Sequence, residues 1–180
     1  MSGRSIAGLL VAIALVSCSA SSSSDPRLSF SDDVPADFRE VATDAWTRFT
    51  TMFEARRDCL APVNVEAAWE LGDRARYEPR TRVVIVRIPG TAPNLTATLV
   101  HEFAHHLEFT CEDQRLLRPR FLEAAELPQG SAWFRSARYE AVPSERFAEA
   151  VVTVVLGRSS RIGVPVAPDA VDVVRDWAGA

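Results

Sequence analysis

The stretch "LVHEFAHHLE", residues 99–108, contains all three histidines of the 180-residue chain. His101 and His105 flank Glu102 in the pattern His-Glu-x-x-His. In a helix, residues four apart lie one above the other, about 6 Å apart along the axis, so both imidazoles can reach one metal ion. Glu102 is rotated by about 100° from His101, which places it beside the metal, where it can accept a proton from a water molecule.

The residues around the histidines favour a buried helix. Those between and next to them are uncharged, as expected for a helix that crosses a protein interior: Val100, Phe103, Ala104 and Leu107. A surface helix on which the two histidines meet by chance is the alternative. The third histidine, His106, is expected to contact solvent or a nearby carboxylate, and we assign it no role as a metal ligand.

A catalytic zinc ion needs a third protein ligand, and the chain has no further histidine to supply it. The longer zinc motif, with glycine three residues and histidine six residues after the second histidine, is excluded because these positions hold Glu108 and Cys111. A carboxylate on a second helix is the other common solution. Glu145 and Glu149 lie one helical turn apart, so both can face the first helix. One of them can bind the metal while the other accepts the N–H of a ligating histidine. Two solvated glutamates are the alternative.

The two motifs together resemble the gluzincin metallopeptidases, most closely the minigluzincins and the catalytic domain of anthrax lethal factor. The likeness consists of His101-Glu-x-x-His105 followed by Glu145-x-Phe-Ala-Glu149, and it covers about residues 60–157. The resemblance implies that His101, His105 and Glu145 bind one zinc ion and that Glu102 is the catalytic base. It also implies that Glu149 accepts a hydrogen bond from a histidine ligand, His101.

The resemblance further implies a fold and an activity. The implied fold is a small zincin-like α+β domain, mainly helical, with a small sheet whose edge strand precedes the histidine helix. The implied activity is zinc-dependent hydrolysis of a peptide or protein that pairs by β-augmentation with this edge strand, expected at residues 81–88. Lethal factor has a tyrosine shortly before the ligand glutamate, where it stabilises the oxyanion. Tyr139 occupies a similar position, six residues before Glu145 and one residue away from the expected offset.

Hydrophobic periodicity and turn residues predict a single folded domain, residues 31–180, without internal repeats. Helices are expected at residues 35–57, 95–109, 118–130, 144–157 and 169–177, and strands at 61–69 and 81–88. Asn94 and Ser144 are expected to cap the helices that they precede. Gly72 and Pro79 indicate turns, and residues 131–143 are expected to be irregular.

The N-terminus resembles a bacterial lipoprotein signal. Arg4 precedes an apolar run, Ile6 to Val16, and the sequence Leu15-Val-Ser-Cys18 resembles a lipobox. We therefore expect a signal peptide at residues 1–17, a lipidated Cys18, and a serine-rich tether at residues 18–30. This organisation predicts an extracytoplasmic domain of the bacterial cell envelope, anchored to the membrane by lipid. An ordinary secretory signal with a chance cysteine is the alternative.

The remaining cysteines, Cys59 and Cys111, are expected to form a disulfide, since exported domains meet an oxidising environment. Two buried free thiols are the alternative. The formal net charge is −4 and there is no basic run, so nothing indicates a nucleic-acid partner. Two other functions are compatible with the sequence: a non-catalytic, zinc-stabilised lipoprotein that binds a partner, and a metal-assisted amidase acting on cell-wall material. Glu102 argues against the first, because a purely structural site does not use a base.

Overall fold

The computed structural model describes residues 26–160 and 163–179. The expected signal peptide, residues 1–17, and the expected lipidation site, Cys18, lie outside this range. The tether expected at residues 18–30 ends earlier than predicted. Residues Leu28–Phe30 form the first strand, β1, which pairs in parallel with β2 (Val63–Ala68). The folded domain therefore begins before residue 31, because this short strand adds to the sheet.

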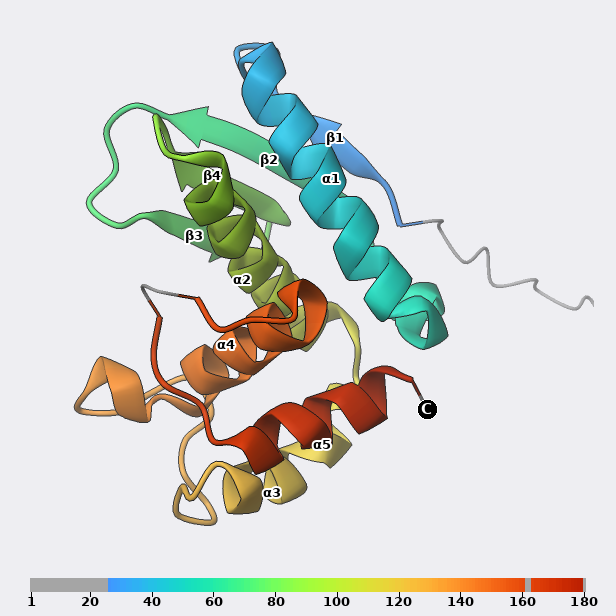
Figure 1. Ribbon diagram of the computed structural model, residues 1–180, viewed down its shortest axis with the longest axis vertical. Coiled ribbons are helices and arrows are strands. Elements are labelled where there is room, and N and C mark those ends of the chain that lie inside the picture. The colour runs from blue at the N-terminus through green and yellow to red at the C-terminus, as the bar shows by residue number, and fades with distance from the viewer. Residues whose placement is uncertain (1–25, 161–162, 180) are drawn as a thin grey trace, which may run out of the picture.

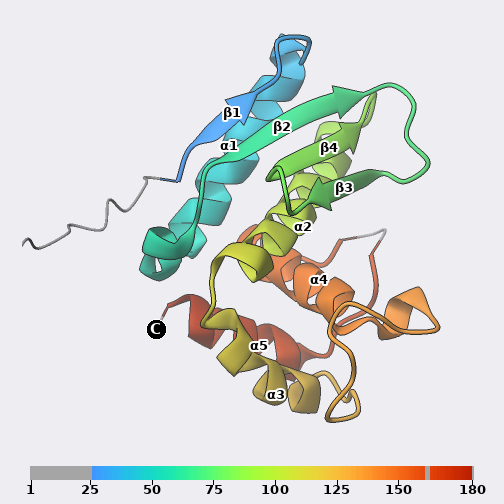
Figure 2. The ribbon, with the colours of Figure 1, turned by 180° about the vertical axis from the view of Figure 1, so that it is seen from behind.

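The sheet has the strand order β1-β2-β4-β3 (Figure 1). β4 (Val83–Arg87) is parallel to β2, whereas β3 (Ala75–Glu78) is antiparallel to β4. Alternating side chains of β4, Val84 and Val86, are fully buried in the core, as expected for a strand with one face against helices. Two helices, Ala36–Met52 (α1) and Ala92–Thr110 (α2), lie behind the sheet in the view of Figure 2.

The expectation that the edge strand precedes the histidine helix is wrong in one respect. The strand before that helix is β4, and it lies inside the sheet between β2 and β3. The edges of the sheet are β1 and β3, and the edge strand next to β4 is β3, which the sequence does not reveal because it is short and lies between Gly72 and Pro79. A strand of this length is stabilised by pairing with its neighbour more than by its own residues.

The histidine helix, α2 (Ala92–Thr110), packs beside α1 (Ala36–Met52) (Figure 1). Their contact is aromatic, with the rings of Trp46 and Phe103 edge to face at 4.9 Å. α2 begins earlier than expected. Its N-cap is Thr91, because Pro93 is accommodated in the first turn, where its missing N–H costs no hydrogen bond. The expected cap, Asn94, lies inside the helix.

The other half of the molecule is helical. α4 (Pro143–Leu156) packs against α2 and ends at Gly157, whose φ of 67° is left-handed. α3 (Gln114–Ala124) and α5 (Pro168–Ala178) lie together below α4 in Figure 1. A short 3-10 turn, η2 (Tyr139–Ala141), precedes α4. Within the described residues, no helix combines the length and apolar character needed to cross a membrane.

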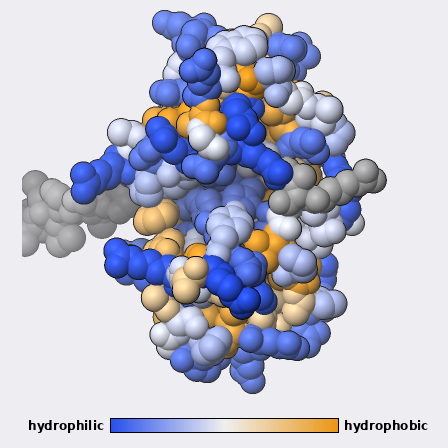
Figure 3. All heavy atoms as spheres, turned by 90° about the vertical axis from the view of Figure 1, so that its left-hand side faces the viewer, coloured by the Kyte–Doolittle hydropathy of each residue, from blue (hydrophilic) through white to orange (hydrophobic). Residues whose placement is uncertain are grey.

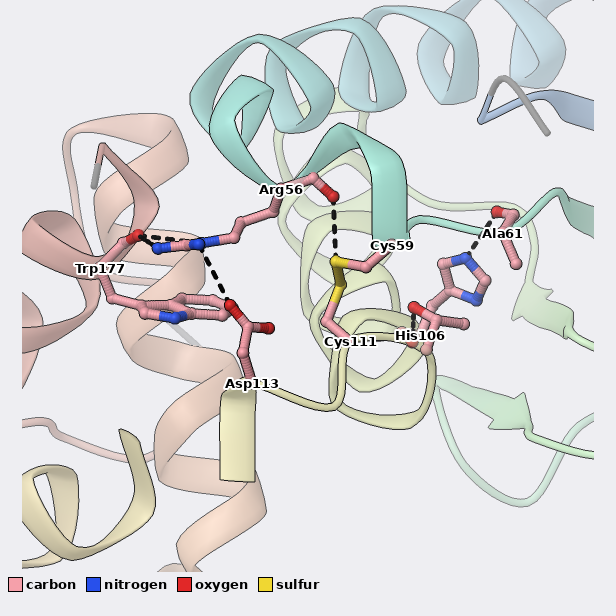
Figure 4. The surroundings of a disulfide bond; sticks show 8 residues. Arg56, Cys59, Ala61, His106, Cys111, Asp113 and Trp177 are labelled. Carbon is pink, nitrogen blue, oxygen red and sulfur yellow. Dashed lines mark hydrogen bonds and ion pairs between the residues drawn. A yellow bond between two sulfur atoms is a disulfide. The ribbon is translucent and has the colours of Figure 1, made fainter. Parts of the chain in front are cut away.

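The expected disulfide between Cys59 and Cys111 is confirmed (Figure 4). It joins the 3-10 helix η1 (Glu54–Cys59), which follows α1, to the residue that ends α2. Next to it, the guanidinium of Arg56 donates to the carbonyl of Trp177 at 2.7 Å and pairs with Asp113 at 3.1 Å. The C-terminal ends of α1, α2 and α5 are therefore tied together, which holds the end of the histidine helix in place.

Candidate metal centre

A cavity of about 610 Å³ lies between the edge strand β3, the helices α2 and α4, and the segment around η2. It opens on the face shown in Figure 3, which is hollowed across its middle with hydrophilic residues in the hollow. His101, Glu102 and His105 line it from α2, and Glu145 and Glu149 line it from α4. The crossing of α2 and α4 thus brings the two sequence motifs, some 40 residues apart, to one site.

Three side chains can hold a metal ion together: His101, His105 and Glu145 have ligand atoms that all lie within 4.8 Å of one another. The two imidazole Nε2 atoms are 3.2 Å apart. The carboxylate of Glu145 lies 3.1 Å from Nε2 of His101 and 3.7 Å from Nε2 of His105. Of the two glutamates proposed on α4, Glu145 is therefore the one that reaches both imidazoles at their Nε2 atoms.

The other nitrogen of each imidazole is held by a carboxylate. Nδ1 of His101 lies 2.9 Å from Glu149, and Nδ1 of His105 lies 2.8 Å from Glu108. A carboxylate only accepts hydrogen bonds, so each Nδ1 donates its proton and each Nε2 is left to face the cavity. This arrangement orients a histidine for metal binding and raises its basicity.

Glu108 is a functional candidate that the sequence reasoning missed. Its side chain is completely buried and accepts hydrogen bonds from three groups: Nδ1 of His105, the hydroxyl of Ser144 at 2.7 Å, and the indole N–H of Trp133 at 2.7 Å. The signal was its spacing of three residues after His105, which places both on one helix face. The expected capping role of Ser144 is wrong, since its hydroxyl points to Glu108 and Val142 holds the N-cap position.

The partner of His101 is covered by a loop that the sequence did not single out. Gly163 lies against the carboxylate of Glu149, and a Cβ atom built on this glycine overlaps that carboxylate. The N–H of Gly163 donates to the hydroxyl of Ser160 at 2.7 Å, and both residues line the cavity. The absence of a side chain at residue 163 therefore lets the loop approach Glu149 closely.

The expected base and the expected oxyanion donor both lie at this cavity. Glu102 is buried, and burial raises the pKa of its carboxyl group, although both histidines and a hydrogen bond from the backbone of Tyr77 act in the opposite direction. The hydroxyl of Tyr139 donates to Glu145 at 2.6 Å. Burial and this hydrogen bond raise the pKa of Tyr139.

The electrostatic environment favours a cation between the two imidazoles. Burial alone lowers the pKa of His101, but hydrogen bonds with Glu145 and Glu149 outweigh it and raise the pKa to about 9. The pKa of His105 is raised well above its usual value in the same way, against burial, by Glu108 and Glu145. The same contacts keep the pKa of Glu145 well below its usual range, although burial opposes this. A site of this kind binds positive charge, either as protons or as a metal ion.

His106 is not on this site, and the expectation that it contacts solvent or a carboxylate is wrong. It is fully buried and points towards Ala61 (Figure 4). Its Nε2 donates to the carbonyl of Ala61 at 2.9 Å, and its Nδ1 accepts from the hydroxyl of Tyr77 at 3.0 Å. Burial lowers the pKa of His106 to about 4, so it is neutral at pH 7.

Comparison of the chain with protein-family models, with curated proteins and with solved structures gives no match in any of the three. What the site can do therefore rests on its own geometry.

Proposed function

We propose that the chain is a zinc-dependent peptidase. One observation carries the proposal: a buried carboxylate, Glu102, lines the same open cavity as the three donors His101, His105 and Glu145, beside an edge of the sheet. A purely structural metal site has no use for a base or for an open cavity. This combination is the one that metal-assisted hydrolysis requires.

Zinc fits the donor set better than magnesium or calcium. Two imidazole nitrogens and one carboxylate oxygen are a typical set for catalytic zinc, whereas magnesium and calcium prefer oxygen ligands alone. The carboxylates behind His101 and His105 fix the tautomers that direct both Nε2 atoms into the cavity. When bound, zinc polarises the scissile carbonyl and lowers the pKa of water to about 7.

The residues of the chain then have distinct roles. Glu102 accepts the proton of the attacking water and delivers it to the leaving amine. Its position on α2, one residue after His101, places it next to the three donors without competing for the ion. Tyr139 lies at the same carboxylate that faces the imidazoles, so its hydroxyl can turn from Glu145 to the carbonyl oxygen of a substrate. A well-placed donor of this kind contributes about 3 kcal/mol.

The edge strand β3 supports a peptide as the substrate. The N–H of Arg87 donates to the carbonyl of Arg74 at 2.8 Å. Arg74 and Arg87 are therefore a hydrogen-bonded pair of the antiparallel ladder, in which bonded and non-bonded pairs alternate. Ala75 and Tyr77 belong to non-bonded pairs, so their backbone N–H and C=O groups point away from β4, towards the cavity side. The Tyr77 backbone already bonds to Glu102. An extended peptide that pairs with β3 therefore runs past the base. This replaces strand 81–88 as the strand that binds the substrate.

We also propose that the domain is exported and anchored to the bacterial cell envelope by lipid on Cys18. The sequence Leu15-Val-Ser-Cys18 supports this proposal. The disulfide between Cys59 and Cys111 agrees with it, since disulfides persist in oxidising compartments. Mass spectrometry of Cys18 in membrane fractions tests it, and an unmodified cysteine there contradicts it.

The test of the proposed activity is turnover of a random peptide library by the zinc-loaded protein and by Glu102→Gln. The variant keeps the shape of the side chain but cannot accept a proton, so we expect full zinc content and a loss of turnover of about 10²–10⁴-fold. Glu123→Gln, at an exposed position on α3, is the matched control and retains activity. Wild-type turnover by Glu102→Gln overturns its role as the base.

Two further outcomes identify the competing functions. Cleavage of peptidoglycan fragments but of no peptide indicates a cell-wall amidase with the same metal site. A fully zinc-loaded wild-type protein that cleaves neither substrate indicates a non-catalytic binding module.

A further inference from the structure

Exposed aromatic side chains gather at the cavity. Among the described residues, five large hydrophobic side chains are exposed, and three of them line the cavity: Phe109, Phe134 and Tyr139. Tyr139 has a polar partner in Glu145. Phe109 and Phe134 have no such reason to face solvent, and their exposed fractions are 49% and 46%. Exposed apolar residues that cluster in a cleft indicate a binding surface.

The two rings are held in one orientation. They stack on each other with centroids 4.9 Å apart and an angle of 16° between their planes. The guanidinium of Arg118 lies over the ring of Phe134, 5.4 Å from its centroid, and the ring of Tyr77 lies 5.9 Å from that of Phe109. The pair, which we call the aromatic step, is therefore positioned before any ligand arrives, which reduces the entropy cost of binding.

The aromatic step lies at only one end of the cavity. Phe109 follows His105 by one turn of α2, whereas Ala97 and Thr98 line the cavity one turn before His101. At the His101 end the two described loop residues that line the cavity, Ser160 and Gly163, are also small. A side chain bound at the two ends therefore meets different surfaces.

The length of α2 sets the distance between the aromatic step and the reacting bond. Phe109 lies six residues beyond the point midway between His101 and His105, which corresponds to about 9 Å along the helix axis. An extended peptide covers this distance in two to three residues. From Ala97 to Phe109 the cavity follows α2 for about 18 Å, which accommodates about five extended residues.

We propose that the aromatic step is a specificity subsite that binds an aromatic or large aliphatic side chain two or three residues from the cleaved bond, on one side of it only. This proposal rests on the proposed peptidase function and names its substrate class. The bound side chain covers the exposed ring faces of Phe109 and Phe134. Substrates without such a side chain leave these rings in water and lose that contribution.

Cleavage-site profiling of a random peptide library by mass spectrometry tests the proposal, using zinc-loaded protein with its disulfide intact. The wild type is expected to enrich apolar residues two or three positions from the cut on one side. For a peptide chosen from this profile, Phe134→Ala is expected to lower kcat/KM about ten-fold, mainly by raising KM. Phe109→Ala, which changes a residue of α2, is expected to lower kcat/KM to the same extent. Trp69→Ala removes an aromatic side chain that is 70% exposed and does not line the cavity, so it leaves the profile unchanged.

A second measurement does not depend on turnover. In the Glu102→Gln background, Phe134→Ala is expected to lower the affinity for the same peptide about ten-fold. If no peptide is cleaved, the peptide for this measurement is chosen by affinity selection from the library with Glu102→Gln. An unselective profile, or wild-type behaviour of both phenylalanine variants, overturns the proposal while leaving the peptidase function intact. Absence of peptide cleavage by the zinc-loaded wild type overturns the peptidase function. Absence of peptide binding by Glu102→Gln overturns the subsite.

Discussion

The neighbouring histidines His105 and His106 lie on two different faces of α2 and have opposite chemistry. His105 faces the cavity between the carboxylates of Glu108 and Glu145, and its pKa is raised. His106 faces the core, where the hydroxyl of Tyr77 and a backbone carbonyl satisfy both ring nitrogens, and its pKa is lowered to about 4. Residue type is the same at both positions. The surrounding carboxylates favour a proton or a metal ion at His105, whereas burial keeps His106 neutral.

The two faces of α2 are expected to have separate roles, one in metal binding and the other in folding. Carboxylates surround the cavity face, so changes there are expected to alter affinity for a metal ion and to leave the fold intact. On the core face the partners of His106 are a hydroxyl and a backbone carbonyl, so a change there is expected to alter the free energy of unfolding. The variants below test this separation.

The largest effect is expected for Glu145→Ala, which removes one of three donors from the cavity face. Loss of a carboxylate that only supports a ligand costs about 10–100-fold in affinity, so loss of the ligand itself should exceed 100-fold. Chelator competition measures the zinc affinity. The control is Glu140→Ala, which changes an exposed residue of the preceding turn. In the metal-free state, both variants are expected to melt at the same temperature as the metal-free wild type.

His106→Phe is expected to act on the other face. It preserves a ring in the core but leaves the carbonyl of Ala61 and the hydroxyl of Tyr77 without their partner, at a cost of about 2 kcal/mol in the free energy of unfolding. Urea unfolding measures this cost, and Tyr77→Phe, which removes only one of the two bonds, should cost less. A variant that folds with wild-type stability but fails to bind zinc contradicts the separation of the two faces.

The same residue predicts a pH dependence. The pKa of His106 is about 4 in the folded protein, below its usual value of 6.5, so the unfolded chain takes up the proton more readily. Its contribution to stability is complete above about pH 6.5 and is lost as the pH falls towards 4. His106→Phe should therefore show a smaller loss of stability over this interval than the wild type.

The sequence predicted the contacts that depend on helix periodicity and missed those that depend on tertiary pairing. The four-residue spacings of His101 and His105 and of Glu145 and Glu149 were sufficient to place each pair on one helix face. β1 and β3 were missed because strands of three and four residues carry too few side chains to show a period. The role of Gly163 could not be predicted, because glycine is required there by the close approach of Glu149, which is distant in the sequence.

Glu149→Ala should weaken zinc binding by about 10–100-fold while leaving a recognisable site, because Glu149 only orients Nδ1 of His101. The comparison with Glu145→Ala, in the same chelator competition, decides which glutamate is the ligand. If Glu149→Ala proves the more damaging, the third ligand is Glu149.

The smallest effect is expected for Gly163→Ala. The new methyl group overlaps the carboxylate of Glu149, so either the carboxylate or the loop must move, and zinc affinity should fall by less than the loss for Glu149→Ala. Gly72→Ala is the control, since nothing lies within 4 Å of a Cβ atom at that position. In the Glu149→Ala background, Gly163→Ala should have no further effect on zinc affinity, and a full additional loss refutes the coupling.

Elemental analysis of the purified protein tests the central claim, that the cavity face of α2 and Glu145 together hold a zinc ion. After mild purification, or after addition of zinc to metal-free protein, we expect one zinc ion per chain in the wild type. We expect the same in His106→Phe, and none in Glu145→Ala after dialysis against chelator. Wild-type protein that contains no metal and takes up no zinc contradicts the claim.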